Sequence, residues 1–419
     1  MTDGVLWHPF ADMGAVAGNE LVIERGEGCW VFDTDGRRYL DATASLWYAN
    51  LGHGRPEVIA AIHAQLQRLD SFNTFGDYAN PPSLELADRL ATLAPDMAPK
   101  VLFGSGGGDA IDAAAKVARA HFATTGRPER NHLIARRHGY HGTHGFGTSI
   151  AGIPANAAGW GELVPDVSVV AHDDAAALET EIERVGAGRV AAFFCEPVIG
   201  AGGVRLPPDG YLEATAEICR RHGVLFVADC VISAFGRLGT WLGIDRWPVR
   251  PDMICLAKGI TSGVLPLGAL LVSAEVAAPF FPGRPGAPVL RHGVTYAGHP
   301  VSCAAALACL DLYARDGLIE QGRTLEGELD AVLRPLEAHP AVAEVRAGLG
   351  LIGAVGLDPA LLEAMPDAPV RVQMACRAAG VLVRPVGVGV AVSPPLTISS
   401  AELALIGEAL AGGLVALER

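Results

Sequence analysis

The sequence predicts an α/β fold in which a large domain is built on a mostly parallel sheet and a smaller α+β domain is built from both ends of the chain. The first observation is length, because 419 residues exceed what a single hydrophobic core usually holds. The second is that short apolar runs alternate with segments of helical periodicity along the middle of the chain, as in parallel sheets. The third is that helical patterns dominate after about residue 303.

The apolar runs of the middle segment predict the strands of the central sheet. Each run is bounded by turn residues or by a segment of helical spacing. The predicted strands are 100–103, 132–135, 167–171, 190–195, 224–229, 253–257 and 269–273. Helices are predicted over 110–122 and 208–222, and the Pro/Gly-rich segment 281–288 predicts a loop.

The two ends of the chain predict the smaller domain. Alternating residues at 22–23, 30–32 and 38–40 indicate a small sheet that packs on the carboxy-terminal domain, where short strands are expected at 341–345 and 381–384. We therefore expect residues 1–58 to form the amino-terminal part of the small domain, 59–312 the large domain and 313–419 the carboxy-terminal part of the small domain.

Composition argues against several classes of partner. The net charge of −14 repels a phosphate backbone, and no basic run with interleaved aromatic residues occurs, so nucleic acid is not an expected partner. No stretch of about 18 uncharged apolar residues occurs, so a membrane is not expected either. The start, Met1-Thr2-Asp3-Gly4, lacks a secretory pattern, and the eight cysteines form no Cys-x-x-Cys pair. These features predict a cytoplasmic location.

Ligands of parallel α/β sheets bind at the carboxyl ends of the strands, so residues that directly follow the apolar runs are the candidates for chemistry. After the run at 100–103 the chain passes through Gly106, Gly107 and Gly108 into a helix. Backbone N–H groups at such a helix start bind a phosphate. The spacing departs from the dinucleotide pattern because Asp109 stands in place of its third glycine. A plain turn is the alternative.

An acid and a lysine end two further strands. Asp229 can hold a pyridine nitrogen protonated, although a helix cap or a salt bridge is the alternative for a single aspartate. Lys258 is one of only three lysines, with Lys100 and Lys116. Its place at the end of an apolar strand predicts desolvation and a lowered pKa, as an amine nucleophile requires. Ordinary solvation is expected for the other two lysines.

Three histidines follow the run at 132–135. His138, His141 and His144 are spaced by three, but glycines interrupt them and no carboxylate is nearby, so we expect no metal site. Tyr140 can stack on a planar cofactor. A phosphate cradle, a strand-end acid and a strand-end lysine are together the groups that pyridoxal phosphate requires.

Further segments along nearly the whole chain match one family. They are 6–10, 45–54, the glycine cradle, 140–142, 196–204, 207–211, 229–239, 257–263, 292–300 and 393–396. Through them the sequence resembles the class III, or omega, aminotransferases, which depend on pyridoxal phosphate and have fold type I. The resemblance implies a ping-pong reaction through a Schiff base on Lys258, in which an amine donor gives its amino group to the cofactor and a carbonyl acceptor removes it.

The resemblance also implies a role for each matching cofactor residue. Lys258 would carry the cofactor and Asp229 would pair with its pyridine nitrogen. Tyr140 and Val231 would enclose the ring, and Glu196 belongs to the same cofactor site. Gly107 and Gly108 would donate backbone N–H groups to the phosphate.

Other matching residues concern the substrate and the partner subunit. Thr295 would reach the phosphate from a neighbouring subunit, which implies a homodimer with active sites at the interface. Trp47, Arg384 and Phe10 would contact the substrate, with Arg384 binding a carboxylate.

The sequence departs from the family pattern at three positions. Gly108 replaces a serine beside the phosphate, which removes a hydroxyl donor and predicts weaker cofactor binding. Cys230 replaces a glutamate after Asp229. Ala201 replaces a glutamate that ornithine and 4-aminobutyrate aminotransferases often carry, which argues against those two substrates.

Several functions stay open at this point. The resemblance favours an omega-amino acid or a simple amine as donor and pyruvate as acceptor. A diaminopelargonate-type aminotransferase and a specialised biosynthetic aminotransferase are alternatives within the family. An aminomutase or racemase, and a non-catalytic binding protein, are alternatives from other classes.

Overall fold

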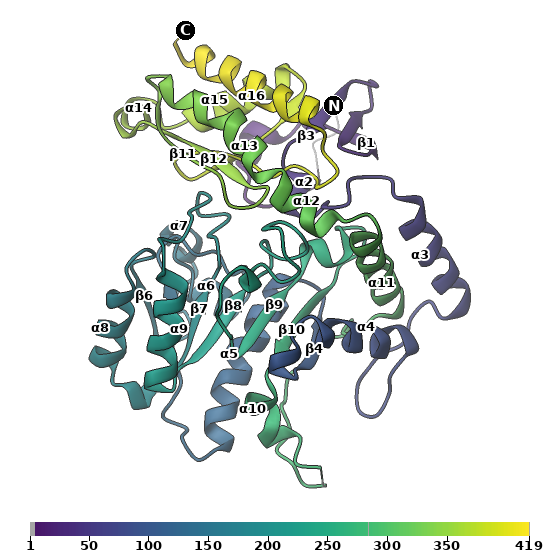
Figure 1. Cartoon of the computed structure of the whole chain (residues 1–419), viewed down its shortest axis with the longest axis vertical. Coiled ribbons are helices and arrows are strands. Elements are labelled where there is room, and N and C mark those ends of the chain that lie inside the picture. Colours follow the sequence, from purple (N-terminus) through teal and green to yellow (C-terminus); the bar gives the residue numbers. More distant parts are fainter. Residues whose placement is uncertain (1–4, 284, 419) are drawn as a thin grey trace.

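The computed structural model describes residues 5–283 and 285–418. Met1 to Gly4, on which part of the expected location rests, lie outside the described residues. The chain forms a large part around a central sheet and a smaller part that contains both ends of the described chain (Figure 1). This arrangement confirms the predicted fold class.

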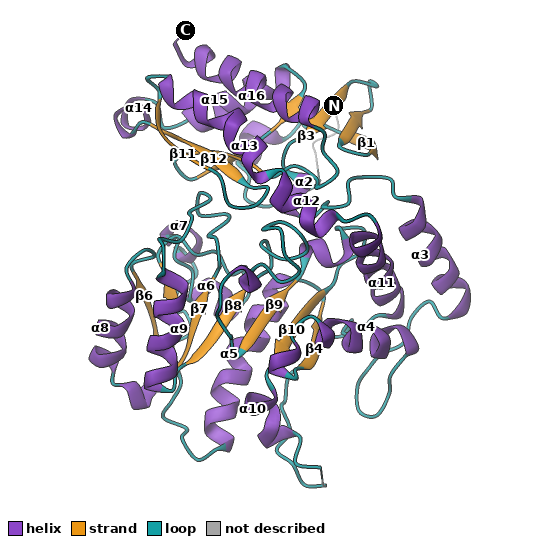
Figure 2. Cartoon of the chain, viewed as in Figure 1, coloured by secondary structure: helices purple, strands orange, loops and turns teal. Residues whose placement is uncertain are grey.

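The central sheet contains the strands that the apolar runs predict. These are β4 (Lys100–Gly104), β5 (His132–Arg136), β6 (Val167–Val170), β7 (Val190–Cys195), β8 (Leu225–Asp229), β9 (Met253–Leu256) and β10 (Gly268–Val272), in the spatial order β4-β10-β9-β8-β7-β5-β6. Strand β10 runs antiparallel to β4 and β9, and the neighbours from β9 through β6 are parallel. The sheet is therefore mostly parallel, with helices on both faces (Figure 2).

Helices cover the two faces with different apolar side chains. Helix α5 (Gly107–Thr124) packs on one face, and α8 (Ala175–Val185) and α9 (Tyr211–His222) lie on the other. Successive residues of β7 separate accordingly: Phe193 joins the core under α8 and α9, and Phe194 joins the core under α5. All six residues of β7 are buried, because a central parallel strand meets a helix layer on each side.

The smaller part contains two sheets. Strands β1 (Ile23–Glu27), β2 (Trp30–Asp33) and β3 (Arg38–Asp41) form one sheet with β13 (Val381–Leu382), which is parallel to β3. The other contains β11 (Val342–Arg346), β12 (Gly353–Leu357), β15 (Gly389–Val392) and β14 (Arg384–Val386) in that spatial order. The two ends of the chain thus share a sheet. The single strand predicted at 381–384 is wrong, because this segment divides between the two sheets.

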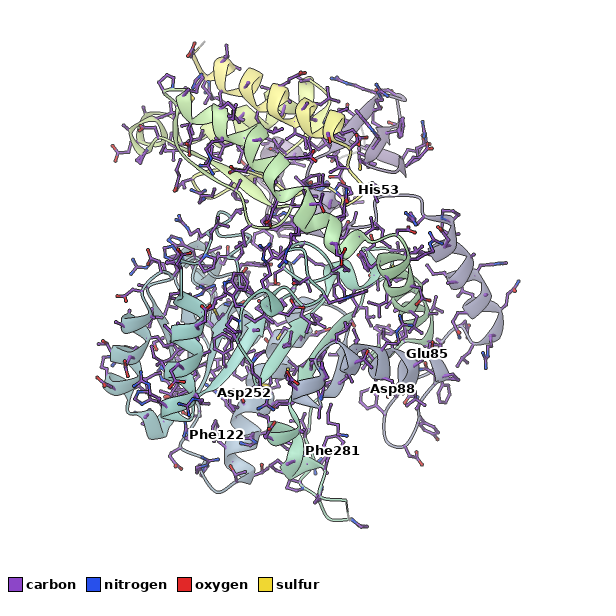
Figure 3. All side chains as sticks on the ribbon, viewed as in Figure 1. His53, Glu85, Asp88, Phe122, Asp252 and Phe281 are labelled. Atoms are coloured by element: carbon purple, nitrogen blue, oxygen red, sulfur yellow. The ribbon has the colours of Figure 1, made fainter. Side chains whose placement is uncertain are left out.

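Two groups of helices occur in the chain segments that link the smaller part to the central sheet. Helices α3 (Pro56–Arg68), α4 (Pro81–Thr92) and α11 (Pro300–Arg315) pack together, and α12 (Leu318–Thr324) and α13 (Glu326–Leu333) follow. The predicted domain limits after residues 58 and 312 fall inside α3 and α11, and they stay predictions. His53 lies near the junction of the two parts (Figure 3), where its Nε2 is 2.9 Å from Oδ2 of Asp41.

One helical segment of the described chain, Ser400–Glu418, is long and apolar enough by length and composition to cross a membrane. It comprises α16 (Ser400–Val415) and a short 3₁₀ turn, and α16 packs against α13 and α15 (Ala368–Ala378). Its buried face, which includes Leu403, Ile406 and Leu410, belongs to the core of the smaller part.

A buried arginine joins the two parts above the sheet. Arg237 is fully buried, and its Nη1 donates to the carbonyl oxygens of Leu351 and Pro394, each at 2.7 Å. Its Nη2 donates to Oδ1 of Asn50 at 2.8 Å. Burial lowers the pKa of Arg237 to about 10. One side chain of the large part thereby fixes both terminal segments over the strand ends.

Candidate active site

A cavity of about 380 Å³ lies at the carboxyl ends of the central strands, and Leu46 and Tyr48 of the smaller part also line it. Residues from six separate stretches of the chain line it. They are Leu46, Tyr48, Ser105, Gly106, Gly107, Gly108, Ile111, Tyr140, His141, Gly142, Glu196, Asp229, Val231, Ile232, Ala257, Lys258, Thr261, Gly263, Leu265, Pro266 and Leu267. The cavity therefore brings together the residues predicted at the ends of β4, β5, β7, β8 and β9.

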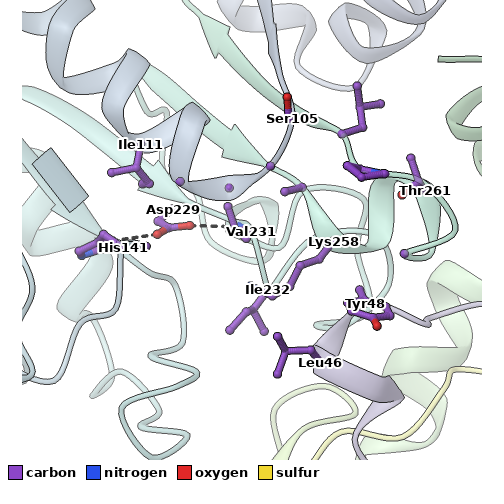
Figure 4. Close-up of a pocket in the computed structure, with 18 of the residues that line it drawn as sticks. Leu46, Tyr48, Ser105, Ile111, His141, Asp229, Val231, Ile232, Lys258 and Thr261 are labelled. Atoms are coloured by element: carbon purple, nitrogen blue, oxygen red, sulfur yellow. Dashed lines mark hydrogen bonds and ion pairs between the residues drawn. The ribbon is translucent and has the colours of Figure 1, made fainter. Parts of the chain in front are cut away.

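Lys258 enters the cavity directly after β9. It begins a short 3₁₀ helix, Lys258–Thr261, with a left-handed φ of 50°, a conformation that costs a non-glycine residue about 1–3 kcal/mol. Its side chain points into the open space (Figure 4). Burial lowers the pKa of Lys258, although Asp229 and Glu196 oppose this effect. The amine thus loses its proton more readily than an exposed lysine does.

Asp229 ends β8 and is fixed from two sides. Its Oδ2 lies 2.8 Å from Nδ1 of His141, and its Oδ1 accepts from the N–H of Val231 at 3.1 Å (Figure 4). Asp229 and His141 are both buried. Nε2 of His141 has no hydrogen-bond partner among the described residues. The carboxylate is therefore oriented before any ligand binds.

His141 is a site residue that sequence reasoning did not assign. The histidine spacing suggested only a metal, and within residues 5–283 and 285–418 no group of three potential metal-ligating side chains occurs. The partner of His141 is an aspartate 88 positions away. The match of segment 140–142 to the family was the one available signal for His141, but the spacing of the histidines did not indicate that Asp229 is its partner.

Glu196 holds the loop that carries Tyr140. Its Oε1 accepts from the N–H of Tyr140 and its Oε2 from the N–H of Gly200, both at 3.0 Å. Burial, with the nearby charge of Asp229, raises the pKa of Glu196. Burial also raises the pKa of Tyr140, so its phenol stays neutral. Glu196 thus positions Tyr140 at the cavity wall.

The glycine cradle forms another part of the cavity wall. Gly107 begins α5, and the preceding cap residue, Gly106, offers no side-chain hydrogen bond, so the first N–H groups of the helix are available to an anion. A β-carbon at Gly107 would lie 2.8 Å from Cγ1 of Val231. Only glycine therefore leaves room for the close approach of these two segments.

Trp47 does not line the cavity. It is 3% exposed and packs in a separate apolar cluster with Val198 and Val204. Ala44, Ser45 and Trp47 all have positive φ in the short helix α2 (Ala44–Trp47). This backbone turns Trp47 inward and leaves Leu46 and Tyr48 at the cavity. Leu46 and Tyr48, and not the predicted Trp47, therefore line the cavity.

Three other predicted residues lie outside the cavity lining. Phe10 is 74% exposed and lines a separate pocket with Trp160 and Thr148. Thr295 lines a second cleft together with Gly106 and Gly108 of its own chain. Arg384, on β14, is half-buried, and its positive charge acts on Tyr140 and Lys258. Arg384 is thus the predicted substrate residue that acts electrostatically on the site.

Comparison with known proteins decides the family. The profile of the aminotransferase class-III family matches residues 13–413. The chain belongs to the class III aminotransferases. It is 34% identical to an omega-aminotransferase of Caulobacter vibrioides, with 94% of this chain and 93% of that protein covered. It is 36% identical to a beta-alanine–pyruvate aminotransferase of Pseudomonas aeruginosa, with 84% and 83% covered.

A solved structure agrees with this assignment. An amine transaminase from an uncultivated Pseudomonas species, in its PLP-bound form, has a TM-score of 0.93 and 38% identity, and the match covers 98% of both chains. The present aminotransferase therefore uses pyridoxal phosphate. Its residues fit this cofactor, since a buried amine, an oriented carboxylate and free N–H groups at the start of α5 surround one cavity.

The burial of Lys258 predicts a pH-dependent stability. In the cofactor-free protein at about pH 7, Lys258→Met should raise the midpoint of thermal unfolding, because methionine removes the cost of a buried ammonium group. The pKa of Lys258 is lower in the folded state than in the unfolded state, so the stability of the wild-type protein rises with pH. The difference in unfolding midpoint between Lys258→Met and wild type should therefore shrink as the pH approaches the ordinary lysine pKa. Lys100→Met, at an exposed position, is the control. A less stable Lys258→Met at every pH would contradict this account.

Proposed function

We propose that this aminotransferase takes an amino group from an omega-amino acid or a simple primary amine and delivers it to pyruvate or a related keto acid. The names of the two relatives above support this substrate class. The observation that carries the proposal is the position of Lys258, whose amine faces the same cavity as the oriented carboxylate of Asp229.

The residues of the chain divide the work of the reaction. When bound, pyridoxal phosphate withdraws electrons from the substrate carbon that bears the amine. Nζ of Lys258, with its lowered pKa, accepts the proton from this carbon and later returns one. Asp229 would hold a proton on the pyridine nitrogen of the bound cofactor, and His141 keeps the Asp229 carboxylate in place.

The cavity wall near Lys258 indicates the shape of the donor. Leu46, Ile232 and Leu265 are apolar, and Tyr48 adds an aromatic ring. Arg384 is the positively charged side chain that acts electrostatically on Lys258 and Tyr140. It would bind the carboxylate of an acidic donor or acceptor. An amine with an apolar body and a keto acid therefore suit the two half-reactions.

The other functions considered above lack a supporting observation. A diaminopelargonate-type or specialised aminotransferase would share the same lysine and carboxylate, and a donor and acceptor screen separates these possibilities. An aminomutase or racemase would turn over without a separate acceptor. We also propose a cytoplasmic location, which the eight buried, unpaired cysteines support.

We propose in addition that the enzyme acts as a homodimer in which Thr295 completes the site of the partner subunit. Thr295 lines one cleft together with Gly106 and Gly108. These glycines also line the main cavity, so a second copy placed against this face would bring its own loop near the phosphate position.

Substitution of Lys258 tests the reaction. Lys258→Ala should abolish transamination with every donor and acceptor pair, a loss of at least about 10³-fold, because the proton carrier is removed. Product formation from beta-alanine or a simple amine with pyruvate is the measurement, and Lys100→Ala is the matched control. Transamination by Lys258→Ala, or conversion of an amine by the wild-type enzyme without any acceptor, would refute the proposal.

Mixed subunits test the contribution of Thr295. Neither Lys258→Ala nor Thr295→Ala homodimers should be fully active. When the two proteins are unfolded, mixed and refolded, a hybrid dimer should contain one site with both Lys258 and Thr295, if Thr295 acts across the interface. We expect the mixture to exceed the summed activity of the two variants refolded separately. Activity equal to that sum would place Thr295 in its own subunit or outside the site.

A further inference from the structure

The space beside Gly108 is occupied by a histidine. Gly108 stands where the family carries a serine, and a β-carbon built there would lie 3.2 Å from both Cε1 and Nδ1 of His144. This distance is tighter than an ordinary van der Waals contact. The imidazole of His144 therefore reaches the region that a serine side chain would enter.

His144 is held at this position by both neighbouring segments. It directly precedes α6 (Gly145–Ser149), in which the N–H groups of Phe146 and Gly147 donate to Oδ1 of Asp112, each at 3.1 Å. Asp112 belongs to α5, the helix that begins at the cradle. A β-carbon at Gly147 would lie 2.3 Å from the carbonyl oxygen of His141. The start of α6 thus packs closely on the cradle helix and on the backbone of His141.

A contact with Asp109 orients the ring of His144. Its Nδ1 lies 3.3 Å from Oδ1 of Asp109, and the side chain of His144 is half-exposed. Asp109 is fixed in turn, because its Oδ2 accepts from the N–H of Ser105 at 2.7 Å. With Nδ1 directed to Asp109, Nε2 remains available to a ligand, and an imidazolium donates from both nitrogens.

The ring lies beside the cradle that would hold the cofactor phosphate. His144, Ser105, Gly106 and Gly108 line one cleft, and the last three of these also line the main cavity. A phosphate bound by the first N–H groups of α5 would therefore lie within the neighbourhood of His144. An N–H of His144 that donates to an anionic phosphate oxygen forms a strong, charge-assisted hydrogen bond.

We propose that His144 replaces the missing serine as the side-chain donor to the phosphate of pyridoxal phosphate, an inference that rests on the proposed function. His144, oriented by Asp109, supplies the interaction that Gly108 lacks. The weaker cofactor binding expected from Gly108 alone is then offset by a residue from a different segment.

Cofactor affinity of the apoprotein tests this proposal. His144→Ala should raise the dissociation constant for pyridoxal phosphate by about 10- to 100-fold, the usual effect of losing a hydrogen bond to a charged group. The dissociation constant for pyridoxal, which has no phosphate, should change by less than about twofold. His144→Gln keeps a donor and should lie between wild type and His144→Ala. His63→Ala, at an exposed position on α3, is the matched control.

A second substitution separates a phosphate contact from a structural role. In the His144→Ala background the ring no longer crowds residue 108, so adding Gly108→Ser should recover most of the lost affinity for pyridoxal phosphate. Three results would overturn the proposal. They are an equal loss of affinity for pyridoxal and for pyridoxal phosphate, wild-type affinity for pyridoxal phosphate in His144→Ala, and no recovery of affinity in the double variant. If wild type binds pyridoxal phosphate in none of these titrations, the proposed function itself fails.

Discussion

The burial of one amine beside one fixed carboxylate is the constraint around which the site is organised. Lys258 has a lowered pKa because the end of β9 is shielded from water, and Asp229 is oriented by His141 and by the N–H of Val231. Both arrangements cost free energy in the folded protein, since burying a charged or polar group is unfavourable unless it is paired. The hydrophobic layers on both faces of the sheet supply the stability that allows them.

The parallel sheet explains why these residues meet. Strands β7, β8 and β9 run in one direction, so Glu196, Asp229 and Lys258 all follow strands at one edge, where open α/β sheets bind ligands. The smaller part closes this edge from above. Arg237 makes the connection durable, because it bonds to segments from both ends of the chain.

Much of this could be predicted from the sequence because the signals were local. Each buried strand was a continuous apolar run, and the candidate residues followed those runs directly. The position of Trp47 could not be predicted, since it depends on left-handed backbone at Ala44, Ser45 and Trp47, none of which is a glycine. The contact between His141 and Asp229 could not be predicted from the histidine spacing, because the folded sheet brings these two distant residues together. The division of 381–386 between two sheets depends on pairing with β3 and β15.

The most direct test of the account is to locate the covalent bond between the protein and its cofactor. The chain has only three lysines, and two of them lie outside the cavity lining. Borohydride reduction of the protein saturated with pyridoxal phosphate, followed by peptide mass spectrometry, should place the added mass on the peptide that contains Lys258 and on no other. Modification of Lys100 or Lys116 in its place, or no modification at saturating cofactor, would contradict the central claim.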